Sequence, residues 1–159
     1  MKITFIAVGR LKENFFSAAV EEYSKRLSKY ATFEIIEVAD EKAPESLSLA
    51  EEAIILLKEG QKILKAIKPG AYVVATAING KQLDSEELSR FMAKLGVDGV
   101  SHICFVIGGS LGLSNEVLER ADYLLSFSKM TFPHQLMRVM LAEQVYRGFR
   151  IISGEPYHK

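Results

Sequence analysis

Short apolar runs alternate along the chain with longer segments in which apolar side chains recur every three or four positions. The short runs are rich in β-branched and aromatic residues and show little polar alternation, which is typical of strands that are covered on both faces. We expect strands near residues 2–8, 33–38, 72–78, 102–107 and 123–127. Because helical patterns separate these runs, the chain is predicted to form an α/β fold around a mostly parallel sheet with helices on both faces.

The helical segments carry recognisable start and stop signals. Asp84 or Ser85 is an N-cap candidate before a first turn rich in acids, and Ser114 or Asn115 is a second one. The Pro-Gly pair at 69–70 is expected to end a long helix. We expect helices at about 13–27, 48–67, 84–95 and 114–121, a last helix from Pro133, and a loose loop at 40–48.

The totals bound the class of protein. With 159 residues, the chain is expected to form one domain over 1–159. Its only cysteine, Cys104, lies in the apolar run "HICFVI" and is predicted to be buried core, so neither a disulfide nor a cysteine-based zinc site is expected, and no metal site is predicted. No apolar run reaches the ~18 residues of a membrane-spanning helix, and we expect no membrane partner and a cytoplasmic protein.

Charge is balanced overall but unevenly distributed. Residues 1–30 carry six Lys or Arg against three Glu, and residues 122–159 carry five against three acids, whereas residues 31–121 carry nine against fourteen. Two basic ends therefore flank an acidic middle. This asymmetry permits RNA binding without requiring it.

A glycine-rich turn follows the predicted fourth strand, with Gly108, Gly109 and Gly112 in "FVIGGSLGLS". Open α/β sheets bind ligands beyond their strand ends, and glycine lets the backbone approach a ligand closely. No phosphate-binding loop pattern is present. The spelling Gly-x-Ser-x-Gly around Ser110, with His158 downstream, also fits a serine esterase, and a purely structural turn is the third alternative.

The last predicted helix is apolar around nearly its whole circumference, whereas a helix that lies on a sheet needs one apolar stripe. Its apolar residues are Leu136, Met137, Val139, Met140, Leu141, Val145, Tyr146 and Phe149. The second stripe is expected to contact another copy of the chain; full burial within one domain is the alternative. The polar turn 128–132 before this helix is expected to form a site at the sheet edge.

Two further features have both a functional and a structural interpretation. His134 and Arg138 are one helical turn apart, and form either a solvated pair or a pair that meets a polyanion or a partner's tail. The terminal "GEPYHK" is either an idle end or a segment in which Tyr157 and His158 stack on bases and move protons.

Several stretches together resemble one known family. "FVIGGSLGLS", "LSFSKMTFPHQLMRVMLAEQVYR" and "GEPYHK" are similar to the bacterial ribosomal RNA large-subunit methyltransferase H family, a group of small SPOUT-class enzymes. The segments "MKITFIAVGRLKE" and "YSKRL" fit as well, so the resemblance covers essentially the whole chain.

The resemblance implies a C-terminal trefoil knot, a homodimer, and S-adenosyl-methionine as the cofactor. It implies methylation of N3 of a pseudouridine in a 23S rRNA hairpin at the subunit interface of the assembled ribosome. The family's cofactor positions fall on Thr76, Gly108, Phe127, Ser128, Lys129, Met130, Thr131 and Phe132. Thr76 departs from the leucine of relatives, and Lys159 stands where some relatives have arginine.

For catalysis, loss of the weakly acidic N3 proton is the step that needs help from side chains. We expect His158 to act as base or orienting group, Tyr157 to position the target, and Lys159 or Arg138 to supply positive charge. The tail is expected to come from the partner chain. A serine esterase using Ser110, or a non-catalytic RNA-binding module, remains the alternative.

Overall fold

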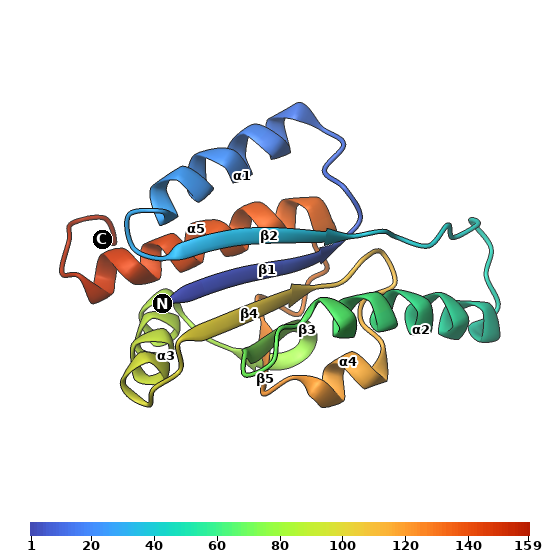
Figure 1. Ribbon diagram of the computed structural model, residues 1–159. Coiled ribbons are helices and arrows are strands. Elements are labelled where there is room, and N and C mark those ends of the chain that lie inside the picture. Colours follow the sequence, from blue (N-terminus) through green and yellow to red (C-terminus); the bar gives the residue numbers. More distant parts are fainter.

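The five predicted strands all form and pair in one parallel sheet with the order β2-β1-β4-β3-β5. The computed structural model describes residues 1–159 and is shown in Figure 1. The strands are β1 Lys2–Val8, β2 Thr32–Val38, β3 Tyr72–Gln82, β4 His102–Ile107 and β5 Tyr123–Ser126. Because all strands run in the same direction, their carboxyl ends meet at one edge of the sheet.

The helices begin and end close to the predicted positions. They are α1 Asn14–Leu27, α2 Leu49–Ala66, α3 Ser85–Val97, α4 Asn115–Arg120 and α5 His134–Ile152. Asp84 caps α3 through a reciprocal capping box with Glu87, and Ser114 accepts a hydrogen bond from the Val117 amide at the start of α4. Pro133 is the N-cap of α5. None of these helices is long and apolar enough to cross a membrane.

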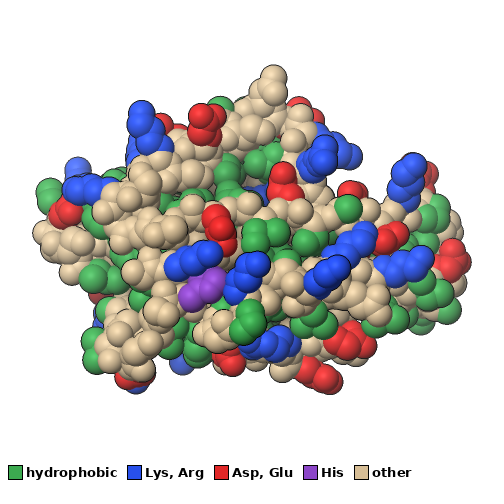
Figure 2. Space-filling model, in the orientation of Figure 1, with side chains coloured by type: hydrophobic (Ala, Val, Ile, Leu, Met, Phe, Trp, Pro, Cys, Tyr) green, Lys and Arg blue, Asp and Glu red, His purple; other side chains and the backbone are tan.

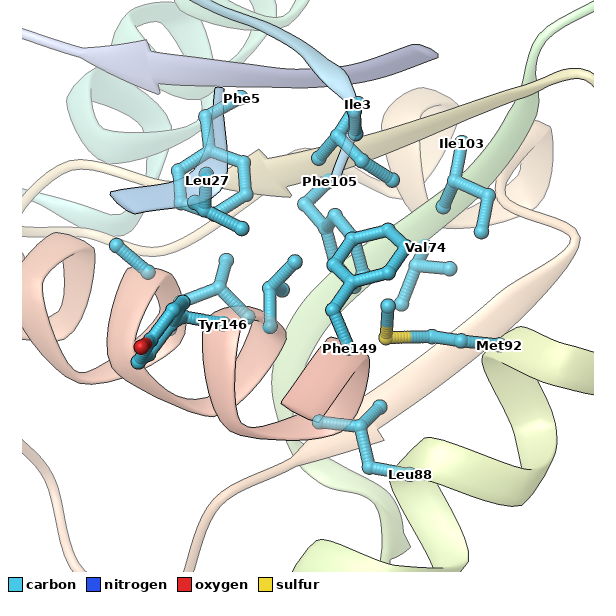
Figure 3. Packing of buried hydrophobic residues seen from close by; sticks show 14 of the residues in the cluster. Ile3, Phe5, Leu27, Val74, Leu88, Met92, Ile103, Phe105, Tyr146 and Phe149 are labelled. Carbon is cyan, nitrogen blue, oxygen red and sulfur yellow. The ribbon is translucent and has the colours of Figure 1, made fainter. Parts of the chain in front are cut away.

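The core lies in two layers, one on each face of the sheet. On one face, side chains of α1, α3 and α5 pack against the strands, and Figure 3 shows Phe5, Phe105, Met92 and Phe149 meeting there. On the other face, α2 and α4 cover a smaller cluster that contains Ile63. Fully burying one such side chain stabilises the fold by roughly 1.5–3 kcal/mol. Cys104 is buried in the second cluster, as predicted.

β3 continues four residues beyond its predicted end. Its pairing with β5 shifts register between Thr76 and Lys81, so the strand bulges before it resumes. Gly80 allows this path, because a Cβ there would lie only 2.7 Å from the Leu124 carbonyl oxygen. The bulge sets residues 76–79 as a wall at the carboxyl edge of the sheet.

α5 buries only part of its apolar surface within the chain. Leu141, Ala142 and Val145 are fully buried against the sheet, whereas Leu136 and Met140 stay partly exposed. Full burial of the helix inside one domain is therefore wrong, because the helix lies on one face of the sheet and presents a second stripe outward.

Candidate active site at the carboxyl edge of the sheet

A cavity of about 350 Å³ opens where three segments meet at the carboxyl edge. These segments are the bulged end of β3, the glycine turn after β4, and the β5–α5 turn with the first turn of α5. The lining residues are Thr76, Ala77, Ile78, Asn79, Ile107, Gly108, Gly109, Gly112, Leu113, Leu118, Leu124, Leu125, Ser126, Phe127, Ser128, Met130, Thr131, Phe132, His134 and Met137.

The structure brings most of the predicted cofactor positions to these walls. Seven of them line the cavity: Thr76, Gly108, Phe127, Ser128, Met130, Thr131 and Phe132. Lys129 does not line it and is exposed, although its neighbours Ser128 and Met130 both contribute to the wall. Sequence reasoning missed the apolar wall formed by Leu113, Leu118 and Met137. Their apolar character was the available signal, and it predicts core equally well.

Two close backbone approaches shape the glycine turn. A Cβ on Gly108 would lie 2.5 Å from the Gly112 carbonyl oxygen, so only glycine fits there. Gly112 has a φ of 85°, and Gly109 and Gly112 form an isolated antiparallel bridge. The turn therefore presents main-chain groups, with little side chain, to the cavity.

The β5–α5 turn is fixed by serine side chains. The Ser126 hydroxyl donates to the Ser128 carbonyl at 3.1 Å, and the Met130 amide donates to the Ser128 hydroxyl at 3.0 Å. Ser126 is buried, so its bond is sheltered from water. These bonds hold a polar turn of defined shape against the apolar wall, which is an arrangement suited to a small ligand with both characters.

The cavity wall contains no Asp, Glu, Lys or Arg, and His134 is its only ordinary titratable side chain. Burial lowers the pKa of His134, and the positive charges of Arg138 and Lys12 lower it further against the opposing effect of Asp40. The imidazole is therefore neutral near pH 7, and the wall as a whole carries no net charge.

The Thr76 hydroxyl has a hydrogen-bond acceptor within the sheet. Its Oγ1 donates to the Val106 carbonyl at 3.1 Å on the neighbouring strand. The departure from leucine at this position is thereby compensated within the sheet, because the added polar group has an internal partner.

Arg138 is buried, with 1% of its side chain exposed, so the solvated-pair interpretation of His134 and Arg138 is wrong. Its Nη2 donates to the carbonyls of Val8 at 2.9 Å and Gly9 at 2.7 Å, and its Nη1 donates to Glu37 at 2.7 Å. The guanidinium satisfies backbone oxygens at the end of β1 and holds α5 against that strand. It does not line the cavity.

The C-terminal tail folds back on α5 and is held there by side chains of that helix. Tyr157 donates to Glu143 at 3.1 Å, and the Arg147 guanidinium lies 4.7 Å from the Tyr157 ring centre. Burial and the contact with Glu143 raise the pKa of Tyr157 to about 12, so this phenol stays protonated near neutral pH. Arg147 also contacts His158 Nδ1 at 3.3 Å. No tail residue, including the exposed Lys159, lines the cavity of its own chain.

The serine esterase constellation is not assembled. Ser110 is exposed on the turn, and α4 begins at Asn115, so the serine does not sit at a strand-to-helix elbow. His158 contacts Arg147 and lies 3.9 Å from Glu86 on α3. Ser110 therefore lacks the adjacent base that would activate it.

Comparisons with known proteins place the chain in a family. A family model described as predicted SPOUT methyltransferase matches residues 1–158. Proteins named ribosomal RNA large subunit methyltransferase H from Clostridium kluyveri and Clostridioides difficile are 62% and 60% identical to this chain, and each match covers both chains completely.

Solved structures share the fold at low sequence identity. A tRNA (m1G37) methyltransferase from Aquifex aeolicus superposes with a TM-score of 0.53 at 15% identity, over 100% of this chain and 75% of the other. A probable methyltransferase from Bordetella pertussis gives 0.56 at 15% identity, over 93% and 96%. The family model and the full-length relatives show that the chain belongs to the SPOUT methyltransferases, in the ribosomal RNA large subunit methyltransferase H family.

Proposed function

We propose that this protein transfers the methyl group of S-adenosyl-methionine to N3 of a pseudouridine in the 23S rRNA of the assembled ribosome. The name of its full-length relatives supports rRNA of the large subunit as the substrate class. The observation that carries the proposal is the cavity at the carboxyl edge, because the family-matched cofactor positions converge on its walls.

The residues present fit this cofactor. The cavity volume of about 350 Å³ lies within the usual range for small-molecule sites. Apolar side chains such as Leu118 and Met137 suit the adenosine faces, and the turns at 108–112 and 127–132 offer backbone groups to its edges. The uncharged wall suits a ligand without phosphate. When bound, the cofactor supplies a methyl group from its sulfonium, and the sulfur is left as a neutral thioether.

The target imide must lose its proton, and one chain alone offers little for that step. His134 is the only ordinary titratable group in the wall, and its lowered pKa makes it a weak base. We assign removal of the N3 proton to His158, with Tyr157 orienting the target and Lys159 supplying positive charge. Arg138 acts by holding the first turn of α5, because its guanidinium is already bonded to β1.

These tail groups would reach the cavity of a second copy. Glu143 and Arg147, which hold the tail, lie nine and thirteen residues beyond His134, so they stand roughly 14 and 20 Å along the helix from it. If two copies of α5 cross antiparallel at the partly exposed Met140, residue 147 of one helix faces the start of the other. The homodimer we propose therefore has composite sites.

We also infer that the C-terminal half is threaded as a trefoil knot, as in the SPOUT class to which the chain belongs. Pulling the unfolded chain by its two ends would tighten such a knot. We expect an extended length shorter than that of 159 free residues. Full extension would show an unthreaded chain.

The proposed reaction is tested with labelled S-adenosyl-methionine and purified ribosomes or free subunits, with and without pseudouridine at the target. We expect label in large-subunit rRNA of assembled ribosomes, and none where uridine replaces pseudouridine. Equal labelling of both substrates would contradict the requirement for pseudouridine, because uridine carries an N3 imide as well. Absence of any labelling, with cofactor binding intact by calorimetry, would contradict rRNA methylation.

A further inference from the structure

Cations without an acidic partner border the cavity. Half of the 20 Lys and Arg side chains form an ion pair with Asp or Glu, and these include Lys2 at the start of β1 and Arg90 and Lys94 on α3. Arg10, Lys12 and Lys129 are exposed and form none. All three lie on turns at the carboxyl edge of the sheet. Figure 2 shows basic side chains gathered where β1 turns into α1 and along α2.

These turns touch the cavity wall directly. Lys129 stands between Ser128 and Met130, which both line the cavity. The Lys12 amide donates to Gln135 Oε1 at 3.1 Å, and Gln135 follows the lining residue His134. The β1–α1 turn therefore sits beside the first turn of α5, at the mouth of the site.

The backbone of the β1–α1 turn is firmly held, whereas its basic side chains are free. The Gly9 amide donates to the Val38 carbonyl at 2.8 Å, the Leu11 amide donates to Glu37 at 3.2 Å, and the Gly9 carbonyl accepts from Arg138. The side chains of Arg10 and Lys12 make no hydrogen bond within the chain. A fixed backbone that presents unpaired cations is preorganised for an anionic partner, because little ordering is left to occur on binding.

The acids near this turn do not neutralise these cations. The Glu37 carboxylate is paired with Arg138 at 2.7 Å. Glu13 and Asp40 are the other acids beside the turn, and neither forms an ion pair with Arg10 or Lys12. Three unpaired cations and two unpaired carboxylates therefore border the uncharged cavity wall on this side.

We propose that Arg10, Lys12 and Lys129 bind backbone phosphates of the rRNA on either side of the target nucleotide. This inference rests on the proposed function. Phosphate contacts from Lys and Arg fix position without reading sequence, while an unstacked base enters the neighbouring pocket. These three cations at the rim of the cavity would allow a chain with zero net charge to bind a polyanion locally.

The test compares a triple variant, Arg10→Gln with Lys12→Gln and Lys129→Gln, against a matched control. The control is Lys25→Gln with Lys65→Gln and Lys68→Gln, three exposed lysines without ion pairs at the far ends of α1 and α2. Binding to ribosomes is measured from 50 to 200 mM salt. Each lost phosphate contact should weaken binding about fivefold at 0.1 M salt and reduce the slope of log K against log salt by ~0.7.

We expect the rim variant to lose about 100-fold in ribosome affinity, while the control loses less than threefold. Arg10→Gln with Lys12→Gln alone, which leaves the turn 127–132 unaltered, should keep its affinity for S-adenosyl-methionine. Equal losses in both variants, or an unchanged salt slope in the rim variant, would overturn the rim proposal. This result is distinct from failure of the proposed function, in which the unaltered protein itself transfers no methyl group to ribosomes.

Discussion

The two ends of α5 have opposite chemistry. Its first turn, with His134 and Met137, faces a cavity without Asp, Glu, Lys or Arg in its wall. Its later turns carry Glu143 and Arg147, which hold Tyr157 and His158 of the tail. One end thus borders a cavity whose wall carries no Asp, Glu, Lys or Arg, and the other carries acid–base groups, of which Glu143 lines a second cavity of about 490 Å³. The length of one helix separates the two within a chain, so the composite site that we propose takes its two ends from two copies.

The largest effect should come from two variants, one that inactivates the tail and one that inactivates the pocket. His158→Ala removes the proposed base and should lower methyl transfer at least 100-fold, while cofactor binding measured by calorimetry is unchanged. Gly108→Ala places a Cβ 2.5 Å from a backbone oxygen and should abolish cofactor binding. Mixing the two inactive variants should restore roughly a quarter of the activity, because half of the dimers then hold one intact composite site.

The mixing experiment decides between shared and separate sites. Each variant must first be shown to fold, by circular dichroism, and to exchange subunits. If exchanged dimers stay inactive, each chain uses its own tail, and the contrast between the ends of α5 has no functional meaning. His158→Gln serves as a second variant, because it keeps a hydrogen-bonding group without a base.

The next effect concerns the residue that anchors the pocket end. Arg138→Met leaves the carbonyls of Val8 and Gly9 without their buried donor and should lower the free energy of unfolding by about 3–5 kcal/mol. Arg138→Lys keeps the charge but loses the fork, and should cost less. Urea denaturation measures both. Equal stability of all three proteins would show that the β1 carbonyls find water, and that Arg138 does not hold the first turn of α5.

Much of this arrangement is local enough to be predicted from sequence. Caps such as Asp84 and Ser114 act within one turn, so most element boundaries fall within a residue or two of expectation. The end of β3 lies further from its predicted position, because the bulge depends on Gly80 approaching Leu124, which is distant in sequence. The burial of Arg138 also depends on distant residues, since the carbonyls that it binds lie about 130 residues away in the sequence.

The features of the site also divide into those that local sequence predicts and those that it does not. The glycine turn and the polar turn before Pro133 each mark a strand end, and parallel strands bring such ends together. That Ser128 faces the cavity while Lys129 faces solvent depends on hydrogen bonds inside the turn, which residue types alone do not specify. The individual cofactor positions came from the family resemblance.

A moderate effect is expected at the tail end of α5. Glu143→Gln removes the carboxylate that accepts from Tyr157, and should lower methyl transfer about tenfold by loosening the tail. It should also lower the pKa of Tyr157 from its value of about 12, because the phenolate no longer faces a negative charge. Ultraviolet titration of tyrosinate measures that shift. Loss of activity with an unmoved tyrosine titration would place the role of Glu143 elsewhere, and Glu119→Gln, an exposed carboxylate on α4, is the matched control.

The smallest effect is expected within the pocket wall, at Thr76. Its hydroxyl donates to the Val106 carbonyl, so its hydrogen is not available for a bond to a ligand. Thr76→Leu adds apolar surface to the wall at the loss of one hydrogen bond, and these effects of about 1 kcal/mol each oppose one another. We therefore expect cofactor affinity to change less than threefold by calorimetry. Thr76→Val, which keeps the shape and removes only the hydroxyl, isolates the bond to β4. A tenfold or larger loss in both variants would mean that the hydroxyl contacts the cofactor, and that the pocket end of α5 faces a more polar wall than the Val106 bond implies.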